Sequence, residues 1–336
     1  MKFIKFPDIG QYRNLIRSVK ETAQFSGVDQ SGKAIFDPLK PLPILELEGT
    51  TKLHGTNGAI GYNKSEDALW FQSRERIITP LDDNAGFART YTDKKNEILK
   101  LLPVCDSAHD VAIFGEWCGQ GIQKGVAISS LSKRFIVFGV NINGEWQPRS
   151  VISNIRNHEI GIYNIYDYPS WKISIDFNKP ELSQNKLQEL TLAVEHSCPV
   201  GAAFGVSGVG EGIVWKVITP GWESPKFWMK VKGEKHSVSK VTTLAAVDVE
   251  LIKTQKDFVT SVVTEARCLQ SLDKLREANK PTDRTSLGDF IRWIYNDILK
   301  EESDTARANN LDLTKMGGLI SSAAKSWYFA NESKLE

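Results

Sequence analysis

The chain has 336 residues, enough for two domains or for one domain with a large core. Hydrophobic residues make up 41% and charged residues 25%, as in an ordinary globular protein. The formal net charge of +1 excludes a strong overall positive field that would attract nucleic acid. A local basic face could still bind it, because such a face does not require a high net charge.

The sequence also argues against a membrane protein and against a disulfide-stabilised protein. No stretch approaches the roughly 20 apolar residues of a membrane span, and residues 1–7 lack the apolar run of a signal peptide. The cysteines are scattered without a Cys-x-x-Cys pair, which argues against a disulfide framework or a structural zinc site. They are Cys105, Cys118, Cys198 and Cys268. We therefore expect a cytosolic protein with reduced thiols and no membrane partner.

In the first two thirds of the chain, short apolar runs alternate with polar and turn-forming residues, a pattern that predicts a sheet-based domain. Short apolar runs separated by Gly, Asn, Asp and Pro indicate strands. The predicted strands are residues 44–48, 59–62, 70–73, 111–116, 135–140, 212–218 and 227–231. Helical spacing predicts helices at residues 11–24, 86–102 and 186–196.

After residue 240 the pattern becomes helical, over residues 242–275, 287–299 and 315–330. Apolar residues from Leu287 to Ile298 recur at i, i+3, i+4 and i+7. Thr285 or Ser286 can cap this helix, and Asp289 lies in its first turn. The predicted class is therefore α+β: an antiparallel-sheet domain over residues 1–236, with its core at about 42–236, and a helical domain over 242–336.

Basic residues lie around the predicted helix 287–299 and could contact phosphates. They are Arg276, Lys280, Arg284 and Arg292. Acidic residues are equally common there, so a solvated face is an equally good interpretation.

The segment KLHGTN at residues 52–57 follows the first predicted strand of the sheet domain. Gly55 removes a side chain where a phosphate would approach the backbone. Lys52 can clamp a phosphate or act as an amine nucleophile. On its own, Lys-x-x-Gly occurs by chance in many proteins.

A second signal lies on the last predicted strand, where Lys230 and Lys232 are two residues apart and share one face. Two amines in one pocket need an anion, and a polyphosphate supplies it. Glu116 and Glu211 border other strands and could accept hydrogen bonds from ribose or hold Mg²⁺ through water. Phe138 could stack on a purine.

Each of these features has a simpler interpretation when taken alone. Lys230 and Lys232 could form the solvated face of a strand, Phe138 could be a core residue, and Glu211 could merely begin a strand. The glycine-rich run at residues 119–125 lacks the Gly-Lys-Ser/Thr ending of a P-loop.

In their order along the chain, these segments resemble the covalent nucleotidyltransferase superfamily of ATP-dependent ligases and mRNA capping enzymes. They are most similar to the phage RNA ligase 2 family, which includes the RNA-editing ligases. Residues 52–57 match its nucleophile motif, including His54 where DNA ligases and capping enzymes usually carry aspartate. Residues 114–116 with 121–124 match the next block, and the likeness spans about residues 45–235.

The remaining motif positions also match. Phe138 falls at the purine-stacking position and Glu211 in the following motif, and Lys230 with Lys232 form the last one. Arg74 matches a short arginine motif.

The resemblance implies an adenylyltransferase domain that uses ATP and Mg²⁺ or Mn²⁺. Lys52 would become adenylylated and pass AMP to an RNA 5′-phosphate, and a 3′-hydroxyl would then displace AMP. Lys230 and Lys232 would stabilise the α-phosphate. Glu116 would hold the ribose.

The other implied roles are less direct. Glu211 would help place the metal through water. Asn57, Arg74 and Gly55 would contribute to nucleotide binding.

The resemblance further implies an RNA ligase (ATP), which is a ligase that forms phosphoric-ester bonds. It also implies a role in RNA repair, a bacteriophage origin and a location in the host cytoplasm. Its partner would be nicked or broken RNA, and the helical domain would set specificity for RNA ends. The alternatives are a DNA ligase, a GTP-dependent capping enzyme, or a catalytically silent nucleic-acid-binding homologue.

Overall fold

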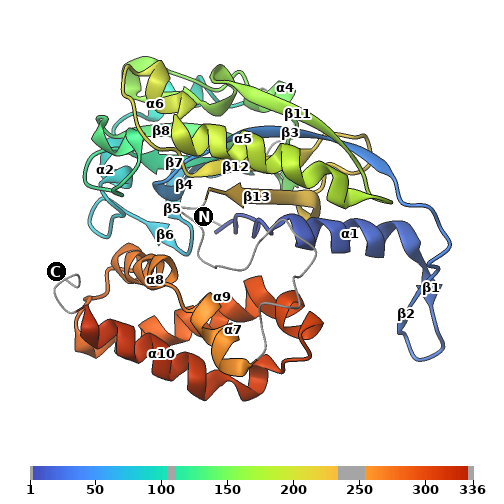
Figure 1. The fold of residues 1–336 in the computed structure, drawn as a ribbon. Helices are drawn as coiled ribbons and strands as arrows, with labels where there is room; N and C mark the ends of the chain where they lie inside the picture. Colours follow the sequence, from blue (N-terminus) through green and yellow to red (C-terminus); the bar gives the residue numbers. More distant parts are fainter. Residues whose placement is uncertain (1–2, 104–109, 234–253, 332–336) are drawn as a thin grey trace. The chain divides into compact units, whose positions relative to one another are not determined.

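The computed structural model describes residues 3–103, 110–233 and 254–331. By its internal contacts the chain divides into two compact units, Met1–Gly10 with Asn14–Gly233, and Gln11–Arg13 with Glu234–Glu336 (Figure 1). The predicted domain boundary at residues 236–242 lies outside the described residues, as does Cys105.

The first unit contains a seven-stranded sheet in the order β10-β8-β7-β4-β5-β6, with β9 paired to β8. Its strands are β4 (Thr56–Asn63), β5 (Ala68–Ser73), β6 (Ile77–Ile78), β7 (Asp110–Cys118), β8 (Arg134–Ile142), β9 (Glu145–Trp146) and β10 (Ile162–Asn164). Every pair is antiparallel except β10 with β8.

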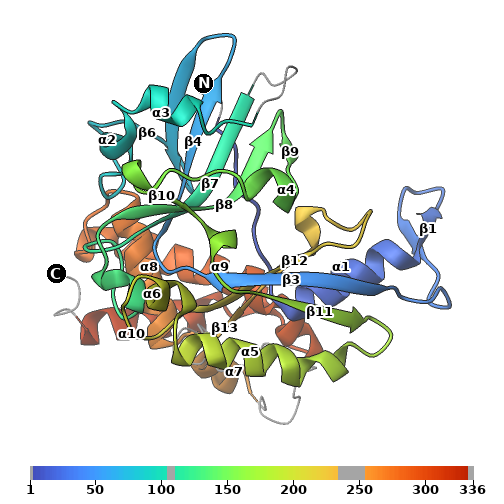
Figure 2. The same cartoon turned by 90° about the horizontal axis from the view of Figure 1, so that it is seen from above.

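A second, four-stranded sheet has the order β11-β3-β12-β13 and is wholly antiparallel. Its strands are β3 (Ile44–Lys52), β11 (Ser170–Asp176), β12 (Gly212–Val217) and β13 (Trp228–Lys232). Helix α5 (Gln184–His196) packs against β12 and β13 (Figure 2). At the outer edge, Gly10 bridges to Met229 in parallel.

Aromatic side chains fill the core under the seven-stranded sheet. Phe87 lies with its ring centroid 4.9 Å from that of Phe135, 5.5 Å from that of Trp117 and 5.4 Å from that of Tyr91. All four residues are at most 1% exposed. Aromatic packing of this kind contributes both buried area and edge-to-face contacts.

A smaller apolar cluster joins the two sheets. Phe6, Ala59, Ala112 and Phe114 pack with Trp228 of β13. The N-terminal segment therefore lies between the sheets, and this packing fixes the distance between β13 and β7.

The predicted helix at 86–102 is wrong as one element. It consists of α2 (Phe87–Tyr91) and α3 (Lys95–Leu99), separated by a turn in which the Lys94 N–H donates to the Tyr91 carbonyl at 3.1 Å. The helices predicted at 11–24 and 186–196 are confirmed as α1 (Tyr12–Gln24) and α5.

The first unit is completed by short elements. The helices are α4 (Arg149–Ile152) and α6 (Pro199–Ala203), and a hairpin joins β1 (Phe25–Val28) to β2 (Ala34–Phe36). Single 3₁₀ turns are η1 (Ala127–Ser130), η2 (His158–Ile160), η3 (Ile165–Asp167), η4 (Pro180–Ser183) and η5 (Pro225–Phe227).

The described part of the second unit is helical. Its helices are α7 (Gln255–Val262), α8 (Glu265–Glu277), α9 (Leu287–Ala308) and α10 (Gly317–Ala330), with 3₁₀ turns η8 (Arg284–Ser286) and η9 (Leu313–Lys315). The predicted helix 242–275 begins outside the described residues and is interrupted, because Thr264 caps a new helix by accepting a hydrogen bond from the Arg267 N–H. Helix α9 runs nine residues beyond its predicted end at 299.

The predicted cap of α9 is confirmed in its position at Ser286 but not in its side-chain hydrogen bond. Ser286 holds the N-cap position of α9 without a side-chain cap hydrogen bond. Asp283 instead caps the preceding turn, where its side chain accepts from the Thr285 N–H at 2.9 Å.

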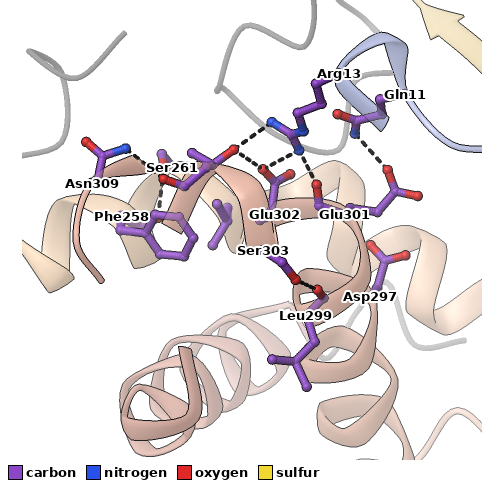
Figure 3. A network of polar contacts seen from close by, with 12 residues as sticks. Gln11, Arg13, Phe258, Ser261, Asp297, Leu299, Glu301, Glu302, Ser303 and Asn309 are labelled. Carbon is purple, nitrogen blue, oxygen red and sulfur yellow. Dashed lines mark hydrogen bonds and ion pairs between the residues drawn. The ribbon is translucent and has the colours of Figure 1, made fainter. Parts of the chain in front are cut away.

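A buried ionic network ties the second unit together (Figure 3). Glu302 on α9 is 0% exposed and accepts from Arg13 at 2.9 Å and from Arg267 at 3.3 Å. Arg267, itself 0% exposed, also pairs with Asp297 at 2.8 Å. Gln11 donates to Glu301 at 2.7 Å, so residues at the start of α1 belong to this network.

These observations confirm the α+β class, with antiparallel sheets followed by a helical region. In the described part of the chain, no helix is both long enough and apolar enough to span a membrane. Cys118, Cys198 and Cys268 are buried and free.

We predict that Arg267→Met destabilises the helical unit by about 3–5 kcal/mol, because Glu302 and Asp297 lose a buried counter-charge. Hydrogen–deuterium exchange of the α8 and α9 amides measures this locally, since a two-unit chain need not unfold in one step.

Arg292→Met is the matched control for this measurement. Arg292 is 72% exposed and pairs with Asp289, so its loss should cost at most about 1 kcal/mol. Equal loss of protection in both variants would contradict the prediction.

Candidate active site

The strand register of the smaller sheet gathers lysines on one face. Gly212 of β12 pairs with Lys52 of β3 on one side and with Lys232 of β13 on the other. Val214, two residues on, pairs with Lys230. Because alternate residues of a strand share a face, all three lysines lie on the same face of the sheet. The opposite face is apolar and packs toward α5.

Glu211 lies at the centre of these lysines and is 3% exposed. Its Oε2 is 2.6 Å from Lys52 Nζ and 3.5 Å from His54 Nδ1, and its Oε1 is 3.2 Å from Lys232 Nζ. The two sequence-predicted motifs, almost 160 residues apart in the chain, therefore meet at one carboxylate.

The charges of this cluster stabilise each other. Burial acts to raise the pKa of Glu211, but the opposite charges of Lys52 and Lys232 and the hydrogen bond from His54 hold it well below its usual range. Burial lowers the pKa of Lys232, against the pull of Glu211. Glu211 is therefore ionised, with the Lys52 and Lys232 amines in contact with it and Lys230 on the same face of the sheet. A polyanion would complement the remaining positive charge.

Gly212 is required by the local backbone. Its φ is +147°, and a Cβ at this position would lie 2.1 Å from the carbonyl oxygen of Val231 on the neighbouring strand. Only glycine allows β12 to pass this close to β13. The close approach sets the position of Glu211, the next residue, between the two lysine strands.

Lys52 is the last residue of β3 (Ile44–Lys52), so the prediction that it follows a short strand at 44–48 is wrong. Gly55 follows, and a Cβ there would lie 2.4 Å from the carbonyl oxygen of Trp117. The glycine is needed for close packing against β7 and not for a left-handed turn.

Glu116 lies beside this glycine. Its Oε1 accepts a hydrogen bond from the Gly55 N–H at 2.9 Å. Burial raises the pKa of Glu116 to about 7, and the charge of Glu211 adds to this while that of Lys52 opposes it. Glu116 thus titrates near neutral pH, within the electrostatic reach of Lys52 and Glu211.

Asn57 pairs with Glu116 across β4 and β7. Its Oδ1 is buried and has no hydrogen-bond partner among the residues that the structure describes. A buried acceptor without a donor is costly. The arrangement suits a ligand that brings a hydroxyl or amine hydrogen to this point.

Phe138 occupies a bulge in β8, where the pairing with β7 shifts between Phe114 and Gly115. Its side chain is half-buried, and its ring centroid is 5.2 Å from that of Phe6, with an angle of 62° between the ring planes. Its carbonyl accepts a hydrogen bond from Lys216 Nζ at 2.8 Å. Phe138 therefore has both a core contact and a partly exposed side chain.

The sequence analysis did not identify Lys216 as a site residue. Lys216 lies two residues after Val214 and so shares the lysine face of β12. Its Nζ is 4.4 Å from the centroid of the Trp228 ring, and burial lowers its pKa to about 8, against the opposing effect of Glu48. The alternation along β12, Gly212-x-Val214-x-Lys216, was the signal that could have found it.

Arg74 has different partners. Its guanidinium pairs with Asp8 at 2.8 Å and with Glu75 at 3.7 Å. The assignment of Arg74 to nucleotide binding stays a prediction.

Glu211 is the carboxylate that the sequence analysis assigned to a metal ion. Among the described residues, no three His, Cys, Asp or Glu side chains gather into a metal-binding group. Direct coordination by Glu211 would compete with its two amine partners. Contact through water, with substrate phosphates as the main ligands, fits this arrangement and the usual preference of Mg²⁺.

Comparison with known proteins identifies the class. The family model described as RNA ligase matches residues 45–232, which is more than half of the 336-residue chain. This chain belongs to the RNA ligase family, which confirms the resemblance to RNA ligases. The matched region contains Lys52, Glu211 and Lys232. No curated protein matches the chain.

Solved structures of Naegleria gruberi RNA ligase also match. A variant with ATP and Mn has 14% identity and a TM-score of 0.45 over 70% of this chain and 58% of that chain. The form with pyrophosphate has 15% identity and a TM-score of 0.43 over 70% and 57%. A variant with AMP and Mn has 15% identity and a TM-score of 0.46 over 70% and 57%. The chain thus covers less than two thirds of the length of these relatives.

We predict that Gly212→Ala disrupts the pairing of β12 with β13, because the new Cβ meets the Val231 carbonyl and alanine is strained at this φ. Faster hydrogen–deuterium exchange of the β12 and β13 amides would show it. Gly288→Ala on α9, where a Cβ meets nothing within 4 Å, is the control and should leave exchange in these strands unchanged. Normal protection in Gly212→Ala would contradict the prediction.

The coupling of Glu116 to its neighbours predicts opposite effects of two substitutions. Lys52→Met removes an opposing charge and should raise the pKa of Glu116 further above its ordinary value, whereas Glu211→Gln should lower it. Carboxyl ¹³C shifts followed by NMR against pH measure both, with Glu116→Gln to assign the resonance. Shifts in the same direction would contradict the electrostatic assignment.

Proposed function

We propose that this protein is an ATP-dependent RNA ligase that joins 3′-hydroxyl and 5′-phosphate RNA ends through a lysyl-AMP and an adenylylated RNA. The contact of Lys52 and Lys232 with buried Glu211, in a chain of the RNA ligase family, is the observation that carries the proposal. RNA repair is the role in which such ends arise.

In the first step, Lys52 loses the proton of its ammonium form to solvent, and the neutral Nζ then attacks the α-phosphorus of ATP. A P–N bond forms, the bond to the bridging oxygen of the β-phosphate breaks, and pyrophosphate leaves with that electron pair. The amine proton passes to water or to the leaving pyrophosphate, because a carboxylate with a strongly lowered pKa, such as Glu211, is a poor acceptor. Glu211 instead orients the amine at 2.6 Å.

The remaining lysines of the sheet face would stabilise the charge of the phosphates. Lys232 and Lys230 lie on the same face as Lys52 and would stabilise negative charge that develops on the α-phosphate. Bound Mg²⁺ would neutralise the phosphates and align the leaving group. Glu211 would meet that ion through water.

Glu116 and Asn57 would bind the sugar. The half-buried carboxylate and the unpartnered Oδ1 are neighbours across β4 and β7, and both can accept from ribose hydroxyls. Phe138 would offer its partly exposed ring to the purine, with Lys216 holding its backbone.

In the second and third steps, the RNA 5′-phosphate oxygen displaces Lys52 from the AMP phosphorus, and a 3′-hydroxyl then attacks the RNA phosphorus and expels AMP. The second step breaks the P–N bond and frees the Lys52 amine, which takes up a proton as it leaves, and the third step releases AMP and the proton of the 3′-hydroxyl. Each phosphoryl step uses the same cationic face of the sheet.

The first experiment is incubation with magnesium and α-labelled ATP or GTP, followed by denaturing electrophoresis and peptide mapping. Protein first stripped of AMP with pyrophosphate should acquire label from ATP on Lys52 alone. Label from GTP would instead support capping chemistry, and no label would support a silent binding protein.

We predict that Lys52→Ala forms no adduct but still seals a pre-adenylylated RNA strand, because the covalent step is then bypassed. Gel assays of both reactions measure this. Lys64→Ala removes an exposed lysine at the start of the turn between β4 and β5 and should form adduct at the wild-type rate. An adduct in Lys52→Ala would show that another residue is the nucleophile.

A further inference from the structure

The hairpin of β1 (Phe25–Val28) and β2 (Ala34–Phe36) is a separate two-stranded sheet in the first unit. It extends from the C-terminal end of α1 and joins neither of the larger sheets (Figures 1 and 2). Within the described part of the chain, β2 pairs with β1 alone. The other edge of β2 is therefore open, and an open strand edge is a template for pairing with a further strand.

The hairpin is apolar and exposed on both faces. Phe25 and Phe36 pair across the strands with their ring centroids 6.3 Å apart, and they are 48% and 47% exposed. Ile35, on the opposite face, is 47% exposed. A lone two-stranded hairpin is at best marginally stable in water, and three or more strands with an apolar face are the usual minimum. Further strands would give these side chains cross-strand neighbours.

Backbone hydrogen bonds show which groups of β2 point outward. The Asp37 N–H donates to the carbonyl just before β1 at 2.8 Å, and the Lys33 carbonyl accepts from the N–H just after β1 at 2.9 Å. Residues 33 and 37 thus direct their backbone groups toward β1. Because these groups alternate in direction along a strand, those of Ala34 and Phe36 point to the open edge.

The edge of β1 is less open than that of β2. The Phe25 carbonyl accepts a hydrogen bond from Lys40 Nζ at 2.8 Å. A lysine at a strand edge is a common protection against pairing. The edge of β2 is consequently the one that remains available for a further strand.

The segment KAIFD at residues 33–37 is complementary to itself in an antiparallel pair. If two copies pair about Ile35, position 34 of one copy faces position 36 of the other. These are the positions whose backbone groups point outward, so they can exchange N–H···O bonds. A shift of one residue would set outward groups against inward groups.

The charges at the ends of this segment favour the same register. With Ile35 at the centre, Lys33 of each copy faces Asp37 of the other, and opposite charges directly across an antiparallel pair stabilise it. Lys33 is exposed, and the Asp37 carboxylate accepts from the Leu39 N–H at 3.0 Å. A shift of two residues would remove both charge pairs.

We propose that β2 pairs with β2 of a second copy of this chain, antiparallel and centred on Ile35, so that two hairpins form one four-stranded sheet. The contact is isologous, as in most homodimers. It does not depend on the ligase chemistry. A five-residue edge buries much less than the roughly 800 Å² per partner of a stable interface, so we expect a reversible dimer.

Disulfide cross-linking of the full chain tests the register. In the proposed pair, Ile35→Cys places two thiols in a non-hydrogen-bonded pair with Cα atoms about 4.5 Å apart, within the range of a disulfide. Mild oxidation should give a covalent dimer on a non-reducing gel. Gln30→Cys is the matched control, an exposed position in the turn of the same hairpin but outside the paired segment. It should stay monomeric, as should the wild-type chain.

Sedimentation velocity over a series of protein concentrations tests the charge pairs. Lys33→Glu should raise the dimer Kd about fivefold to 50-fold, because two opposite-charge pairs become like-charge pairs. Adding Asp37→Lys to it exchanges the charges and should restore the Kd to within about threefold of wild type. Lys64→Glu, at an exposed lysine in the turn between β4 and β5, is the control and should leave the Kd unchanged.

Three results would overturn the proposal. Equal cross-linking of Ile35→Cys and Gln30→Cys would show that the strands do not meet at Ile35. A dimer insensitive to Lys33→Glu, or one that the charge exchange does not restore, would place the contact on another surface or in another register. A monomer at every concentration would leave the edge of β2 to a strand of a different protein.

Discussion

The contact of one buried carboxylate with two amines from neighbouring strands is the interaction on which the site depends. Glu211 would be costly to bury alone, and Lys52 and Lys232 supply the opposite charge that keeps it ionised. The same contact points the Lys52 amine in a fixed direction. Removal of any one of the three would leave a partly desolvated charge without its partner.

The backbone makes this contact possible. Lys52 and Lys232 flank Gly212, and the close approach of β12 to β13 at that glycine sets the place of Glu211. On the other face, apolar side chains pack toward α5. A sheet with one apolar and one charged face can therefore hold several amines at the surface of a rigid core. Trp228 connects this sheet to the seven-stranded one and so fixes the distance to Glu116.

Charges are used in two contrasting ways in the helical unit. Arg267 and Glu302 are fully buried and satisfy each other and their neighbours, so they specify how the helices pack. Arg284 and Lys325 instead flank the exposed ring of Phe329.

The sequence by itself determined the class of fold and the positions of β3, β4, β5, β7, β8, β12 and β13, because alternation and spacing along a strand are local properties. It did not indicate β11 or the order of the strands in either sheet. It also indicated Lys52, Glu211 and Lys232, through their resemblance to a family pattern. It did not determine that Lys52 ends a strand, that the helix at 86–102 is two helices, or that Asp283 caps the turn before α9.

Only the tertiary structure decided which charges meet. The pairing of β3, β12 and β13 brings Lys52, Glu211 and Lys232 together, and the bulge at Phe138 receives Lys216 from the other sheet. The pairing of Arg74 with Asp8 is a further contact of this kind, because the two residues are 66 positions apart in the chain. Such contacts depend on strand register and packing between distant segments, and no local pattern along the chain encodes them.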